Sequence, residues 1–102
     1  MKTCCEKYLA EQFGNDADLI AEIYGEYVVS IKNKTAELAK AIDAADWQTA
    51  DKAAHTIKGN ALAAGDEDMA FLAIETRKAT ALGDADQSRS LLAKMEELGK
   101  GL

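Results

Sequence analysis

The sequence predicts an all-α fold, an antiparallel up-down-up-down four-helix bundle with a short additional N-terminal helix. The chain of 102 residues has no proline and only 6% aromatic residues, a composition that favours uninterrupted helices. Apolar residues recur three or four positions apart, which is the spacing of one helix face. Short Gly-Asp pairs separate these periodic segments and predict antiparallel neighbours. We expect a single domain over 1–102, with a cap segment at 1–14 and the bundle at 16–98.

The first two predicted helices cover residues 3–13 and 16–44. The short helix is expected to cover one end of the bundle with three inward residues, Tyr8, Leu9 and Phe13. Asn15 or Asp16 is expected to cap the long helix. The apolar face of that segment consists of Leu19, Ile20, Ile23, Tyr24, Tyr27, Ile31, Leu38, Ile42 and Ala45.

The next helix is predicted to start after Asp46 and to run through Ala64. Aspartate is a good N-cap, and Gly65 supplies a left-handed stop. The expected buried stripe is Trp47, Ala50, Ala54, Ile57, Ala61 and Ala64.

Two further helices are predicted from the same start and stop residues, an aspartate N-cap and a terminal glycine. Asp66 is expected to cap the third bundle helix and Gly83 to end it. Either Asp84 or Asp86 begins the fourth. The inward residues of the third are Met69, Leu72, Ala73, Thr76 and Ala79, and those of the fourth are Leu91, Leu92, Met95 and Leu98.

Charge and composition narrow the classes of function. A net charge of −6 argues against nucleic-acid binding, which depends on clustered Lys and Arg. The chain has no run of about 18 apolar residues and no apolar signal core, so we expect a cytoplasmic protein without membrane contact. Cys4 and Cys5 are adjacent and far from the single histidine, which predicts free thiols and no zinc site.

The stretch around His55 contains the residues most suggestive of chemistry. Helical spacing places His55 at the edge of the apolar stripe, with Asp51, Lys58, Gly59 and Leu62 on neighbouring turns of the same face. A neutral imidazole is both a nucleophile and a proton acceptor, and a lysine ammonium beside it attracts anions. Glycine inside a helix costs about 1 kcal/mol relative to alanine, so Gly59 indicates a need for close approach. Together these features indicate that this stretch interacts with a phosphoryl group.

The segment HTIKGNALAAG closely resembles the signature of histidine phosphotransfer (HPt) domains. In that family a lysine stands three residues and a glycine four residues after the active histidine, and a second glycine stands at the tenth position. His55, Lys58, Gly59 and Gly65 match all four positions. The resemblance covers roughly residues 16–98, because the helix order and the Gly-Asp turns are also similar.

The segment also departs from the family pattern. Asn60 and Ala61 stand where small hydroxyl residues are common, and Ala64 precedes the second glycine. Family members often carry a polar side chain on the next helix that holds the histidine ring. Thr76 and Arg77 lie at about the right distance along the chain for this role, and a solvated Arg77 is an equal alternative.

The resemblance implies a phosphorelay intermediate and not an ATP-dependent enzyme. A response-regulator receiver domain would present a phospho-aspartate, His55 would attack through Nε2, and a second receiver would accept the group. Lys58 would stabilise the phosphate oxygens and Gly59 would permit docking. Mg²⁺ would come from the receiver, and the chain itself needs no cofactor. A hybrid sensor histidine kinase is a further expected partner, and Met1 favours a free monomeric shuttle over a domain of such a kinase.

Two alternatives remain open. One is an adaptor bundle that binds a signalling partner without chemistry. The other is a metal-binding bundle, which a single histidine disfavours. The docking surface around the histidine is expected to include Leu62, together with Leu9 or Phe13 if the N-terminal segment packs nearby, although core packing is the ordinary explanation for each.

Overall fold

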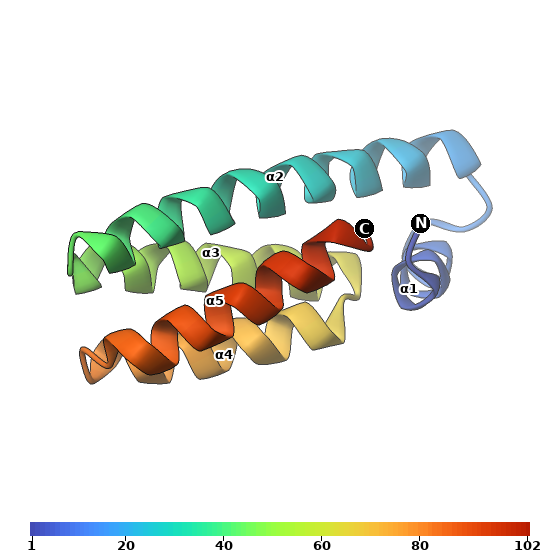
Figure 1. Cartoon of the computed structure of the whole chain (residues 1–102). Helices are drawn as coiled ribbons and strands as arrows, with labels where there is room; N and C mark the ends of the chain where they lie inside the picture. Colours follow the sequence, from blue (N-terminus) through green and yellow to red (C-terminus); the bar gives the residue numbers. More distant parts are fainter.

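The computed structural model describes residues 1–102 and contains five helices and no strand (Figure 1). The helices are α1 (Thr3–Phe13), α2 (Ala17–Asp43), α3 (Trp47–Ala64), α4 (Glu67–Ala81) and α5 (Ala85–Lys100). Each of α2 to α5 packs against the next, and α5 closes the ring against α2. Figure 1 shows α1 nearly end-on, so this helix crosses the bundle axis. The predicted all-α bundle with an additional N-terminal helix is confirmed.

Local signals explain where the bundle helices begin and end. Each bundle helix starts at an aspartate whose carboxylate accepts the amide three residues later. These N-caps are Asp16, Asp46, Asp66 and Asp84. Asp84, and not Asp86, therefore begins the last helix. The residue before each of the last three caps is left-handed, with φ of 53° at Ala45, 75° at Gly65 and 64° at Gly83.

Ala45 is the weak point of this repeated turn. The amide of Asp46 donates to the carbonyl of Ala41 at 2.8 Å, the bond that Asp66 makes to Ala61 in the next turn. Ala45 therefore does what glycine does in the other two turns, but its Cβ makes a left-handed conformation costly. The sequence prediction that Ala45 extends the apolar helix face is wrong, because the residue is exposed and lies beyond the helix.

We expect Ala45→Gly to raise the free energy of unfolding by about 1 kcal/mol, since it removes the left-handed penalty of a non-glycine residue. Urea unfolding would measure the gain. Ala44→Gly is the matched control, because Ala44 is also exposed but has a φ of −85° and gains nothing from glycine. Equal effects of the two substitutions would contradict the explanation.

Apart from Ala45, the core contains the predicted stripes with two exceptions. Among the inward positions predicted from periodicity, Leu38, Ile57 and Met95 are fully buried, whereas Leu19 and Phe13 are 38% and 45% exposed. Leu19 lies in the first turn of α2, where the adjacent Ile20 is buried, so Leu19 faces away from the packed side of this turn. Phe13 is the last residue of α1, and the face of α1 that packs inward is defined by Cys5 and Leu9.

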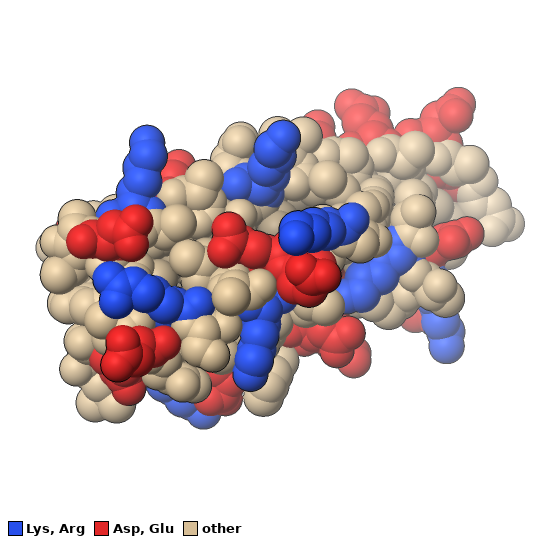
Figure 2. All heavy atoms as spheres, viewed as in Figure 1, with Lys and Arg blue, Asp and Glu red and all other residues tan.

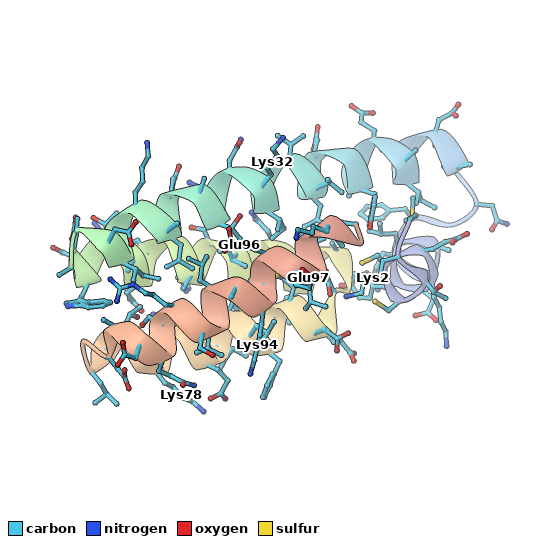
Figure 3. The ribbon with its side chains drawn as sticks, in the orientation of Figure 1. Lys2, Lys32, Lys78, Lys94, Glu96 and Glu97 are labelled. Carbon is cyan, nitrogen blue, oxygen red and sulfur yellow. The ribbon has the colours of Figure 1, made fainter.

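A buried carboxylate joins α1 to the bundle. Asp66, which caps α4, has no exposed surface. One of its oxygens accepts from Nζ of Lys2 at 2.6 Å, and the other accepts from the hydroxyl of Tyr27 at 2.7 Å. Figure 3 shows Lys2 at the junction between α1 and the bundle. Asp66 thus connects three segments that are distant in the sequence.

Further contacts fix the position of α1. The hydroxyl of Tyr24 accepts from the amide of Lys2 and donates to the carbonyl of Leu102, both at 3.1 Å. Gly65 packs so closely against Tyr8 that a Cβ at position 65 would overlap the Tyr8 side chain. Burial, followed by the charge of Asp66, raises the pKa of Cys5 to about 12, so this thiol is unreactive near neutral pH.

Candidate functional site

His55 lies on the exposed face of α3. Residues on the opposite face of the helix, including Ala54 and Ile57, are buried in the core. The imidazole of His55 is exposed, and its Nε2 has no hydrogen-bond partner in the protein. The only histidine of the chain therefore presents one ring nitrogen to an incoming group.

Arg77 of α4 fixes the other side of the ring. Its Nη1 lies 3.0 Å from Nδ1 of His55. Its Nε donates to Asp51 at 3.0 Å, and its Nη2 donates to the second oxygen of the same carboxylate at 3.4 Å. The hydrogen bond that Arg77 donates to Asp51 raises the pKa of Arg77, which stays positively charged. Asp51, Arg77 and His55 thus form a connected set across the α3 and α4 surface.

This set decides between the two candidates for holding the ring. Arg77 contacts the imidazole, whereas Thr76 is buried and its hydroxyl donates to the carbonyl of Leu72 at 2.7 Å. The alternative of a solvated Arg77 is wrong. Sequence reasoning placed Asp51 on the histidine face but gave it no role. Asp51 stands four residues before His55, a spacing that places two side chains next to each other on one helix face, and this spacing could have indicated that Asp51 belongs to the site.

Lys58 lies one turn after His55 and makes no ion pair or hydrogen bond with the protein. The side chain is half-buried and lines a shallow groove between α3 and α4, whose other lining residues include Asp51, Ile74 and Arg77. Its ammonium is therefore available to an anion that approaches the ring. The charged residues that line this groove are Asp51, Lys58, Arg77 and Lys78, of which Arg77 is paired with Asp51 and Lys78 with Glu75.

Gly59 faces solvent beside the histidine. A Cβ at this position would meet no atom within 4 Å, so packing inside the chain does not require glycine here. The next residue, Asn60, points the other way and donates to the hydroxyl of Ser30 on α2. The departure from the HPt pattern at position 60 therefore serves the contact between α2 and α3.

The three residues expected at the docking surface differ in exposure. Leu62 is 52% exposed and lines a hollow between α1 and α3, together with Tyr8 and Lys7. Leu9 is completely buried, so the expectation that it could contribute to a docking surface is wrong. Phe13 is exposed at the end of α1.

Three further observations concern the surface charge, metal binding and membrane spans. On the face drawn in Figure 2, acidic and basic side chains are interspersed. No group of three or more His, Cys, Asp or Glu side chains is arranged to bind a metal ion. None of the five helices combines the length and apolar character needed to cross a bilayer.

Comparison with known protein families gives one finding. The family model described as Hpt domain matches residues 22–101, which is most of the chain and includes α3 and its histidine. No curated protein and no solved structure matches the chain significantly.

Proposed function

The chain belongs to the Hpt domain family, whose members carry phosphoryl groups on a histidine in phosphorelays, and we propose that His55 is the carrier residue here. In this proposal His55 accepts a phosphoryl group from the phospho-aspartate of one receiver domain and passes it to the receiver of another response regulator. The observation that supports it best is that the only histidine of the chain is exposed on α3 and its Nε2 has no hydrogen-bond partner in the protein.

The reaction requires little of the protein beyond position and charge. The lone pair of Nε2 attacks phosphorus, the bond between phosphorus and the aspartate oxygen breaks, and the carboxylate leaves. The ammonium of Lys58 would approach the phosphate oxygens as charge moves onto the leaving group. The receiver would bring Mg²⁺, which neutralises phosphate charge.

The proposed partners are receiver domains and, as a source of phosphoryl groups, a hybrid sensor histidine kinase. We propose that the chain acts as a monomer in the cytoplasm, where it would need neither ATP nor a cofactor of its own. Its Leu62 and the neighbouring surface of α1 would contact the receiver, since they lie on the histidine side of α3.

Incubation with a phosphorylated receiver tests this function. The expected result is acid-labile, base-stable label on the chain, which is the signature of phosphohistidine. A stable complex without label would support the adaptor alternative and overturn the relay. All receivers of the source organism should be compared, because partner identity is not encoded in the site itself.

Replacement of Lys58 is expected to slow transfer without unfolding the protein. Lys58→Ala removes a cation from the phosphate position, and we expect about a ten- to hundredfold lower transfer rate. Rapid-quench kinetics with a phosphorylated receiver would measure it. Lys94→Ala is the matched control, because Lys94 is an exposed lysine of α5 that makes no ion pair. A normal rate in Lys58→Ala would rule out the proposed role.

Substitutions at Gly59 should separate docking from stability. Gly59→Ala is expected to raise the free energy of unfolding by about 0.5–1 kcal/mol, because nothing opposes the added Cβ. Gly59→Gln should retain helicity but lower the transfer rate at least about tenfold, since a long side chain occupies the approach to His55. Gly25→Gln is the control, an exposed glycine of α2 with the same free space. If both glutamine variants transfer normally, Gly59 is not needed for docking.

A further inference from the structure

The contact between Arg77 and His55 determines where the imidazole carries its proton. Arginine has five N–H donors and no acceptor. Because Nη1 of Arg77 lies 3.0 Å from Nδ1 of His55, Nδ1 must use its lone pair as the acceptor. A neutral imidazole has one N–H, which must then be on the other nitrogen. In the free protein the neutral ring therefore carries its proton on Nε2.

Asp51 keeps this arrangement in place. Its carboxylate binds Nε and Nη2 of Arg77, which leaves Nη1 directed at the ring. Asp51 and His55 are four residues apart on α3, so the carboxylate and the imidazole lie on one helix face. The guanidinium cannot turn without losing its ion pair with Asp51.

This state of the ring does not match the attacking form. Attack on phosphorus needs a lone pair on Nε2, and the neutral ring then carries its proton on Nδ1. A protonated Nδ1 cannot accept a hydrogen bond from Arg77, so the contact must open before transfer. The side chains of Arg77 and Asp51 are 36% and 39% exposed, and an exposed ion pair is weak enough for a docking receiver to displace.

The phosphorylated ring can again accept a hydrogen bond from Arg77. When Nε2 forms its bond to phosphorus, the ring releases the proton of Nδ1 to solvent and becomes neutral. Nδ1 then has a free lone pair, which is the acceptor that Arg77 requires. Loss of the phosphoryl group returns an electron pair to Nε2, and this departure is easiest when Nδ1 has first gained a proton. A guanidinium N–H at Nδ1 occupies the place of that proton.

We propose that Arg77, oriented by Asp51, is a positioning residue that stabilises the phosphorylated ring of His55 and delays loss of its phosphoryl group. The inference rests on the proposed function, because it concerns the same ring. It adds a second role to the contact: Arg77 preserves the phosphoryl group between receivers, and docking of a receiver releases this restraint.

The proton position can be measured without any phosphotransfer. The chain contains one histidine, so ¹⁵N NMR of the labelled protein, at a pH where the ring is neutral, reports on His55 alone. We expect the proton on Nε2 in the wild type. In Arg77→Gln the side-chain oxygen can accept from Nδ1, and the proton should shift toward Nδ1. A wild-type ring with its proton on Nδ1, or no change in the variant, would overturn the proposal.

The lifetime of phosphohistidine is the second measurement. Phosphoramidate, a small phosphodonor, would phosphorylate the purified proteins without a receiver, and ³¹P NMR would follow the decay. We expect phosphorylation on Nε2 and about a tenfold longer lifetime in the wild type than in Arg77→Gln or Arg77→Ala, the ratio given by loss of one charged hydrogen bond. Equal lifetimes, or phosphorylation on Nδ1, would overturn the inference.

Controls separate this inference from folding and from the relay. Arg89→Gln makes the same substitution at an exposed arginine of α5 and should leave both measurements unchanged. Arg77→Lys keeps a donor without an acceptor and should retain the proton on Nε2. If no receiver transfers phosphate to the chain, the proposed function fails, whereas the proton position and the chemical lifetime still test Arg77.

Discussion

Replacing His55 by glutamine is expected to abolish phosphoryl acceptance and to leave the bundle folded. Glutamine is similar in size, but its amide nitrogen is not a nucleophile, so we expect at least about a thousandfold loss. His55 is exposed and its one side-chain hydrogen bond is to Arg77, so the free energy of unfolding should change by about 0.5 kcal/mol or less. Transfer of label from a phosphorylated receiver measures the first effect, and urea unfolding measures the second.

The result of this experiment is easy to interpret because the chain has a single histidine. No second histidine can take over, so the variant should carry no acid-labile, base-stable label at all. Binding of the variant to the receiver provides the control, because docking depends on the surface around position 55 and not on the nucleophile. Residual phosphohistidine-type label on His55→Gln would contradict the assignment.

Replacing Asp66 by alanine should destabilise the protein by about 3 kcal/mol, a large share of the stability of a small domain. The substitution removes the N-cap of α4, which costs about 1 kcal/mol. It also leaves the buried hydroxyl of Tyr27 without its acceptor, which costs about 1–3 kcal/mol. Lys2 loses its partner as well, but it is partly exposed and can turn to water.

Asp84→Ala is the matched control for the cap alone. Asp84 caps α5 through the amide of Gln87 at 3.0 Å, but it is exposed and binds no other helix. We expect its replacement to cost about 1 kcal/mol. Urea unfolding of both variants would give the difference, which measures the network that Asp66 forms with Lys2 and Tyr27. Equal costs for the two variants would show that the network contributes nothing.

Most helix boundaries could be predicted because capping is local. An aspartate accepts an amide three residues away, and a left-handed glycine ends the preceding helix, so both signals lie within a few residues. The helix end at Ala45 was not predicted because the local signal is missing there. Alanine gives no signal for a left-handed turn, yet the bonds formed by Asp46 impose one.

Burial was predicted less well at the ends of helices. Leu19 and Phe13 follow the apolar spacing of their helices but are exposed, whereas Ile20 and Leu9 on the same two helices are buried. Periodicity gives the approximate direction of the packed face of a helix, but it does not tell which apolar residues at the margin of that face are covered. Leu9 is buried, which agrees with its predicted inward position and excludes the alternative that it contributes to a docking surface.

The sequence by itself determined the helices, their order and the candidate site at His55, because periodicity, capping and the spacing of Lys58 and Gly59 are properties of short segments. Only the tertiary structure decided that Arg77 holds Nδ1 of His55 and that Lys2 reaches Asp66, pairs separated by 22 and 64 residues. Such pairs meet only when packed helices have a particular rotation and axial register. Those two quantities depend on the sum of many core contacts and not on any local preference.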